Sequence, residues 1–531
     1  MPTSKILPVT SRGRRNPTQA GSGSGSATLA VLLTGTFMTS MDVAIVNVAG
    51  PAITSGLALS GAALQAVVSG YTVSYAALLI SGARLGDDHG HRRLFLVGLA
   101  GFTLASLACG LAWAGPVLIG ARVVQGLAAA AMVPQVVTVI QLRYTGAARA
   151  RALALFATTI SSAVAVGQVL GGALVSANLA GSSWRSVFLV NVPVGVILLA
   201  VGARVLPHTR AEQPRRLDLP GVALLTSIVL LVMGALVFGR QAGWAWWIWT
   251  ALGAAAVLGA GLAGHLRRLA RRGGDPLVDL GLLRRAPVAI GLGVVCAQMV
   301  AYGGLLFSLS LYLQDGLTFS ALRAGLTFAP FALAFAASSL TVPQLPEAVR
   351  RRATGIGLTA MSAGYAGLAA VTGAGKWNQA LTLPLLAVAG AGFGAGYSPV
   401  ITRTLAHVPS ANARDASGLF NTVNQLSYAF GVATIGSVFL TRTMSGNAAQ
   451  TGPAIATAAS TCAALGLLAA LLTVTLTKAE TTAKTLPPPT KQHSPCPHRL
   501  RPTPTGRSPI HRHGADQREV PVQLDDLERN G

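Results

Sequence analysis

The sequence contains few charged residues, few aromatic residues and only four cysteines. Charged residues make up 11% of its 531 residues and aromatic residues 6%, whereas roughly a quarter of the residues in soluble domains are charged. The cysteines lack metal-ligand spacing, and the chain has neither a phosphate-binding G-x-x-x-x-G-K-[ST] loop nor a catalytic triad pattern. These absences exclude a nucleic-acid-binding domain as the main body and an ATP-driven motor on this chain. We therefore expect no enzyme activity, no metal and no cofactor.

Apolar residues, by contrast, make up 52% of the chain. They form recurrent runs of about 20 residues, each long enough to cross the ~30 Å hydrocarbon core of a membrane as a helix. The sequence therefore predicts an all-α integral membrane protein with fourteen transmembrane helices. The predicted spans are 27–50, 64–83, 94–113, 116–140, 152–176, 187–206, 219–239, 245–264, 288–313, 323–344, 354–373, 380–402, 416–440 and 454–477.

The formal net charge of +24 has an explanation that needs no nucleic acid. With fourteen spans, 34 of the 40 lysines and arginines fall on one side of the membrane, five on the other, and only Arg122 within a span. Basic loops stay in the cytoplasm, so we expect a multi-pass protein of the cell membrane with both termini cytoplasmic. Residues 1–26 and 478–531 have no apolar period, and we expect them to form disordered cytoplasmic tails.

Among the 16 acidic residues, only Asp42 lies deep within a predicted span. A charge there costs about 2.5–3.5 kcal/mol on insertion scales, so it normally faces a cavity or a partner. Counted from the outer ends of their spans, Asp42 and Arg122 lie at depths of roughly 12 and 9 Å, so the two side chains can meet on facing helices. We interpret Asp42 as a proton carrier with Arg122 as its partner. The alternative is a static buried pair that fixes helix packing.

The loop between the second and third predicted spans, residues 82–94, reads GARLGDDHGHRRL. It resembles the signature loop of the major facilitator superfamily, G-x-L-a-D-r-x-G-r-k/r, and the resemblance implies a charge relay that latches the outward-open state. The residues that we assign to this latch are Gly82, Asp87, Gly90 and Arg92. Asp88 stands where the family usually has Arg, and His91 where it usually has Arg or Lys. These departures predict a latch that is weaker or sensitive to pH.

Other stretches narrow the resemblance to the fourteen-helix drug:proton antiporters. Residues 41–51 resemble the first-helix motif l-D-x-T-i-V-N-V-A-l-P, and 184–195 resemble W-R-W-i-F-l-i-N-v-P-i-G at the sixth helix. Residues 122–126 resemble R-x-x-Q-G, which the family links to proton transfer. Residues 167–172 resemble the antiporter motif g-P-x-x-G-G, with Gln168 in place of its proline. The glycines of this last motif either serve antiport or simply let helices pack closely; they are Gly167, Gly171 and Gly172.

Polar residues within spans are candidates for a substrate cavity. Asn421, Asn424 and Gln425 recur at i, i+3 and i+4 on one face of a predicted helix. They either line a substrate cavity or cross-link helices by hydrogen bonds. Asn47 and Gln125, which lie close in sequence to Asp42 and Arg122, complete this set.

The resemblance implies a major facilitator fold, with six-helix bundles at 27–206 and 288–477. Two additional transmembrane helices and a cytoplasmic loop would occupy 207–287. The implied function is proton-driven export of antibiotics or other amphipathic drugs by alternating access, powered by the proton gradient. We expect a monomer whose partners are a small-molecule substrate, protons and membrane lipids. Two alternatives are an exporter dedicated to one endogenous metabolite and a non-transporting membrane sensor.

Overall fold

The computed structural model describes residues 22–207, 218–239, 242–374, 377–408, 413–443 and 451–485. The regular structure of these residues is helical throughout. Fourteen helices among them are long and apolar enough to cross a membrane. The prediction of an all-α membrane protein with fourteen transmembrane helices is thereby confirmed.

The N-terminal group of helices comprises seven elements. They are α1 (Ser22–Leu57), α2 (Gly61–His89), α3 (His91–Gly110), α4 (Gly115–Arg143), α5 (Gly146–Ala177), α6 (Ser186–Leu189) and α7 (Asn191–Val205). A single residue, Gly90, separates α2 from α3. Its φ of 93° lies in the region that glycine adopts without steric cost. The chain therefore reverses direction there within one residue.

Three elements form a linker between the two groups of helices: α8 (Leu219–Phe238), α9 (Trp246–Arg271) and the short α10 (Leu280–Leu283). Asp218 caps α8 by accepting a hydrogen bond from the Gly221 N–H, and its carboxylate lies 2.7 Å from His265 Nε2 of α9. Burial alone would raise the pKa of Asp218, but the hydrogen bonds from His265 and from the Gly221 and Leu277 N–H groups lower it below its ordinary value. This carboxylate therefore joins α8, α9 and the segment before α10.

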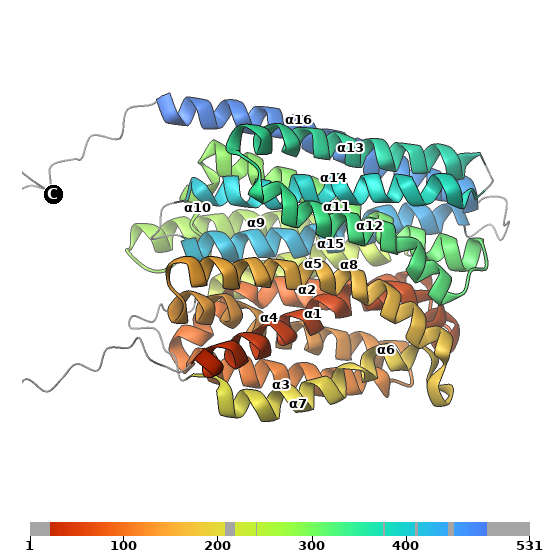
Figure 1. The fold of residues 1–531 in the computed structure, drawn as a ribbon, viewed down its shortest axis with the longest axis horizontal. Helices are drawn as coiled ribbons and strands as arrows, with labels where there is room; N and C mark the ends of the chain where they lie inside the picture. Colours follow the sequence, from red (N-terminus) through yellow and green to blue (C-terminus); the bar gives the residue numbers. More distant parts are fainter. Residues whose placement is uncertain are drawn as a thin grey trace, which may run out of the picture. The chain divides into compact units, whose positions relative to one another are not determined.

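The C-terminal group of helices comprises six long elements. They are α11 (Ala286–Leu311), α12 (Ala321–Thr341), α13 (Glu347–Gly373), α14 (Gln379–Ala406), α15 (Ala413–Thr443) and α16 (Thr451–Thr485). α11 packs on α15, α14 packs on α12 and α13, and a hydrogen bond from Ser362 Oγ to the Ala463 carbonyl joins α13 to α16. Figure 1 shows the helices of both groups running side by side along the horizontal direction.

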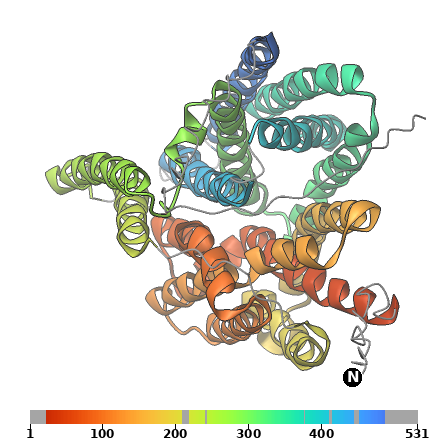
Figure 2. The same cartoon turned by 90° about the vertical axis from the view of Figure 1, so that its left-hand side faces the viewer.

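The two groups meet mainly along two helix pairs, α5 with α12 and α2 with α15, and α1 also contacts α11 and α12. Seen along the helices in Figure 2, the red-to-yellow N-terminal group lies below the green-to-blue C-terminal group, and the yellow-green α8 and α9 lie to the left. α8 packs on both α2 and α15, and α9 packs on α8. Glycine permits the close α5–α12 approach, since a Cβ at Gly172 would lie 2.4 Å from the Ala321 carbonyl oxygen.

Several predicted boundaries differ from the structure, including those of both predicted tails. α1 begins at Ser22, inside the predicted tail 1–26, and α16 continues to Thr485, inside the predicted tail 478–531. The extension of α16 carries Lys478, Ala479 and Glu480, which are good helix formers. They continue the helix beyond its apolar run, where hydropathy gives no signal. The rest of both predicted tails, residues 1–21 and 486–531, lies outside the described residues.

Candidate functional site

Asp42 of α1 and Arg122 of α4 form a buried ion pair between Asp42 Oδ2 and Arg122 Nη1. Their exposed fractions are 0% and 1%. The contact between the two side chains that their depths predicted is thus present in the structure. Because a buried charge is costly without compensation, the groups around each partner decide what the pair can do.

The second oxygen of the Asp42 carboxylate accepts hydrogen bonds from two amides. Gln125 Nε2 lies 2.9 Å from Asp42 Oδ1, and Asn191 Nδ2 of α7 lies 3.3 Å from the same atom. Gln125 Nε2 is also 2.8 Å from Ser106 Oγ of α3. Helices α3, α4 and α7 therefore all contribute to holding the carboxylate of α1.

The guanidinium of Arg122 has its own set of partners besides Asp42. It donates to Gln125 Oε1 at 2.7 Å and to the Val67 carbonyl of α2 at 3.1 Å. Its Cζ lies 4.5 Å from the ring centroid of Tyr71, a cation–π distance. Arg122 would therefore remain held within the N-terminal group if Asp42 lost its charge.

We call Asp42, Arg122, Gln125, Asn191 and Ser106 the polar cluster. Sequence reasoning placed Asp42 and Arg122 in it, assigned Gln125 to a possible substrate cavity, and missed Asn191 and Ser106. Asn191 belongs to the quoted sixth-helix motif and follows an apolar run, so its polarity was a usable signal. Ser106 gave none, because a serine in a membrane helix usually bonds only to its own backbone.

The glycines of the α5 motif are contact points between helices. A Cβ at Gly167 would lie 2.9 Å from the Met41 carbonyl oxygen, and one at Gly171 would lie 3.0 Å from that of Ile45. These two glycines bring α5 against α1 on either side of Asp42, whereas Gly172 faces α12. α5 is one continuous helix through Gln168, whose buried amide makes no hydrogen bond to any described residue.

The residues assigned to the latch lie where α2, α3 and α4 meet. A Cβ at Gly82 would lie 2.0 Å from the Ala130 carbonyl oxygen, so this glycine allows α2 to contact the backbone of α4. Counted back from Asp87, the first glycine of the family pattern falls on Ala83, so Gly82 lies one residue outside that register. Asp87 is 4% exposed, and the Arg92 guanidinium donates to the Ala203 carbonyl of α7.

The candidate cavity residues occupy different surroundings. Asn47 Nδ2 lies 2.9 Å from the hydroxyl oxygen of Tyr428, a bond between α1 and α15. Asn424 Oδ1 accepts a hydrogen bond from the Tyr397 hydroxyl at 3.0 Å. Asn421 is exposed and Gln425 is half-buried on α15.

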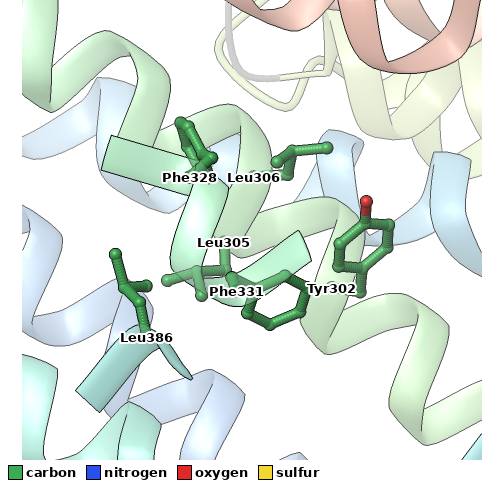
Figure 3. A pocket seen from close by; sticks show the side chains of 6 residues that line it. All are labelled: Tyr302, Leu305, Leu306, Phe328, Phe331 and Leu386. Atoms are coloured by element: carbon green, nitrogen blue, oxygen red, sulfur yellow. The ribbon is translucent and has the colours of Figure 1, made fainter. Parts of the chain in front are cut away.

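Tyr428 and Tyr397 belong to a set of touching rings in the C-terminal group, which we call the aromatic cluster. The ring centroid of Tyr302 lies 5.1 Å from Phe393, 5.7 Å from Phe331 and 5.9 Å from Tyr428, and Tyr397 lies 5.7 Å from Phe393. A small apolar pocket borders the cluster. Figure 3 shows its lining, which consists of Tyr302, Leu305, Leu306, Phe328, Phe331 and Leu386.

Comparison with known proteins identifies the family. Residues 32–432 match the Major Facilitator Superfamily. The chain belongs to this superfamily. It is therefore a multi-pass membrane transporter rather than an enzyme.

Its relatives include antibiotic exporters. The chain is 36% identical over 416 residues to the "Probable actinorhodin transporter" of Streptomyces coelicolor, covering 78% of this chain and 72% of that protein. It is 38% identical over 454 residues to the cephamycin export protein CmcT of Amycolatopsis lactamdurans, covering 80% and 87%. A solved bacterial homologue of the human lysosomal transporter Spinster, inward-facing and occupied, matches with a TM-score of 0.59 at 15% identity, over 88% of this chain and 98% of that one. This last likeness concerns the fold alone.

Proposed function

We propose that this transporter exports antibiotics or other amphipathic small molecules across the cell membrane and is driven by protons moving inward. The export of antibiotics is supported by the relatives, whose names attach them to actinorhodin and cephamycin. The observation that carries the proton coupling is the buried Asp42–Arg122 pair, whose acid is the only carboxylate deep in a span among the described residues.

The polar cluster suits a carboxylate that gains and loses a proton. A proton on Asp42 removes the charge attraction to Arg122, while Gln125, Val67 and Tyr71 continue to hold the guanidinium. The amide of Gln125 and that of Asn191 remain available to the neutral acid, since each carries an oxygen as well as an N–H₂ group. Protonation then loosens α1 from α4 and leaves the buried charge of Arg122 held by neutral partners alone.

Alternating access requires contacts between the helix groups that break and re-form. Ser310 Oγ of α11 lies 2.7 Å from the Asn47 carbonyl oxygen, and Gln314 Nε2 lies 2.9 Å from that of Val48. Gln65 Nε2 of α2 lies 3.1 Å from the Val432 carbonyl oxygen of α15. These bonds lie toward the end where α1 joins α2, which the distribution of arginines assigns to the outside. Release of a substrate to the outside breaks them, with the two helix groups rocking as six-helix bundles.

The substrate would bind beside the aromatic cluster, where an apolar pocket and tyrosine hydroxyls lie together. Sites for amphipathic ligands combine apolar walls, which supply affinity, with a few polar groups that fix orientation. One proton crossing about 100 mV supplies ~2.3 kcal/mol. Since about 1.4 kcal/mol is a factor of ten, one proton per cycle supports a concentration ratio of roughly fifty.

A second candidate is an exporter dedicated to a single compound. It is favoured by the names of the two relatives above, each of which specifies one antibiotic. The two candidates share the same site and driving force and differ only in the range of compounds carried.

The test is transport by the purified full chain in lipid vesicles under an imposed pH gradient, across a panel of structurally diverse antibiotics. We expect transport of several compounds, each coupled to proton movement in the opposite direction. Transport of one compound alone would favour the dedicated exporter. Transport that is indifferent to the pH gradient would contradict proton coupling.

A further inference from the structure

His91 is a buried histidine at the junction of three helices. It is the first residue of α3, follows Gly90 directly and is 0% exposed. Its ring lies between α2 and α4, with Nδ1 2.8 Å from Gln135 Oε1 and Nε2 3.6 Å from Asp87 Oδ1. Neither the polar cluster nor the aromatic cluster includes it.

The surroundings of Gln135 determine which ring nitrogen of His91 carries a hydrogen. Gln135 Nε2 lies 2.8 Å from the Gly82 carbonyl oxygen and 3.0 Å from that of Ala131, and both oxygens can only accept. The amide oxygen of Gln135 therefore faces His91, so Nδ1 must be the donor. In the neutral ring the other nitrogen, Nε2, then carries a lone pair.

That lone pair faces a carboxylate. At 3.6 Å from Asp87 Oδ1, Nε2 makes no hydrogen bond to any described residue. An added proton would turn Nε2 into a donor and create a charge-assisted bond to Asp87, while the bond from Nδ1 to Gln135 would persist. The geometry therefore leaves Nε2 placed to accept one further proton and to donate it to Asp87.

We propose that His91 is a second proton-binding site of this protein, separate from Asp42, and that its proton ties α3 to Asp87 of α2. The position is one where the family resemblance expects a permanent cation, and a protonated histidine supplies that cation only when a proton is available. The inference rests on the proposed function solely for placing this end of the helices in the cytoplasm. Histidine changes charge between pH 5 and 8, so occupancy would follow the pH on that side.

The charged groups near the ring act in opposite directions. Asp87 faces it from α2, with Asp88 next in the chain, and both favour the cation; α4 contributes the neutral amide of Gln135. On α3 itself Arg92 and Arg93 disfavour it, although the guanidinium of Arg92 is directed to the Ala203 carbonyl of α7. The amino-terminal end of α3 also disfavours a cation, and the carboxyl-terminal end of α2 favours it.

The test is a histidine NMR titration of the full chain labelled with ¹³C-histidine, with the His91 signal identified by its absence in His91→Gln. We expect the signal to shift with pH as the ring gains its second proton. In Asp87→Asn, titration should require about ten- to a hundredfold more protons, because the charge-assisted bond is lost. A matched control, His89→Gln, removes an exposed neighbour and should leave the His91 titration unchanged.

A second variant keeps the test valid if Asp87→Asn does not fold. Gln135→Leu removes the acceptor that fixes the hydrogen on Nδ1, so the neutral ring can donate from Nε2 to Asp87 without an added proton. Protonation of His91 in Gln135→Leu should again require a higher proton concentration than in the wild type. A His91 signal that does not titrate, or whose midpoint ignores both substitutions, would overturn the proposal.

The same site should appear in transport. At a constant pH gradient, efflux by the wild type should depend on the pH of the side that His91 faces, and both His91→Gln and His91→Lys should flatten that dependence. The NMR titration should persist in Asp42→Asn, which separates this proposal from proton coupling at Asp42. If efflux depended on pH in both His91 variants as it does in the wild type, His91 would have no role in transport.

Discussion

The N-terminal and C-terminal helix groups bury different kinds of side chain. In the N-terminal group, the polar cluster holds a carboxylate and a guanidinium that are satisfied by amides, a hydroxyl and a backbone carbonyl. In the C-terminal group, the aromatic cluster stacks tyrosine and phenylalanine rings beside an apolar pocket. The N-terminal group therefore buries a pair of opposite charges, and the C-terminal group buries aromatic rings.

This difference suggests a division of labour. A group that handles protons needs a titratable residue with partners for both of its charge states. A group that binds amphipathic molecules needs apolar and aromatic surface with few polar groups. The bond between Asn47 and Tyr428 joins the helix of Asp42 to the aromatic cluster, so it is one direct contact through which one group can influence the other.

The largest expected effect comes from removing the charge of Asp42 in the polar cluster. Asp42→Asn should abolish pH-gradient-driven efflux while leaving membrane insertion intact, because the part of the chain that the structure describes has no other carboxylate deep in a span. The measurement is efflux in vesicles at matched protein levels. Asp315→Asn, the same change at an exposed acid of the C-terminal group, serves as control and should transport normally. Full proton-driven transport by Asp42→Asn would refute the assignment of Asp42 as carrier.

The next effect is on stability and tests whether the pair acts as a unit. Asp42→Asn or Arg122→Gln alone leaves one buried charge without its partner, which costs about 3–5 kcal/mol. The double variant removes that penalty and should be more stable in detergent than either single variant, yet still inactive. A double-mutant cycle on thermal stability measures the coupling. Strictly additive effects would mean that the pair contributes packing alone.

The central pair of the polar cluster was predictable from the sequence, whereas the aromatic cluster was not. A lone acid and a lone arginine in apolar runs are conspicuous, because membrane insertion makes each expensive. Depth along a helix then sufficed to bring Asp42 and Arg122 together. Tyr302 and Phe393, in contrast, look like any other apolar residue until helices far apart in sequence place their rings in contact.

His91 shows a third case, in which the sequence indicated an anomaly but not its chemistry. Its departure from the family pattern predicted sensitivity to pH. Only the orientation of the Gln135 amide, from a helix some forty residues away, determines which nitrogen faces Asp87. Hydrogen-bond direction is a property of the folded network and has no signature in a single sequence.

A smaller effect is expected from a substitution in the aromatic cluster. Tyr302→Leu removes a ring that touches three others, so the affinity for an aromatic compound that the vesicle panel identifies as a substrate should fall about two- to tenfold. The response of transport to the pH gradient should persist. Phe319→Leu is a matched control, since that ring packs on Trp377 outside the cluster. Equal losses of affinity in both variants would mean that the aromatic cluster does not bind the substrate.

The smallest expected effect concerns the junction between the two groups. Tyr428→Phe removes the oxygen that accepts a hydrogen bond from Asn47 and leaves the ring beside Tyr302 in place. A neutral hydrogen bond contributes about 0.5–1.5 kcal/mol, and Asn47 keeps its bond to the Val43 carbonyl, so the loss of stability should be modest. Substrate affinity should hardly change, because both clusters remain whole. The number of protons moved per substrate should rise, because protonation of Asp42 would no longer be tied to movement of α15.

Tyr397→Phe is the control that separates coupling from packing. It removes a hydroxyl from the same aromatic cluster, but that hydroxyl bonds to Asn424, so the bond joins α14 to α15 within the C-terminal group. The two variants should lose similar stability, and only Tyr428→Phe should uncouple protons from substrate. The measurement is simultaneous recording of proton and substrate flux in vesicles. Identical proton-to-substrate ratios in the two variants would show that the Asn47–Tyr428 bond holds the groups together without transmitting the state of Asp42. Coupling would then have to pass through the backbone contacts of α5 with α1 and α12, where Gly167 and Gly172 bring the helices closest.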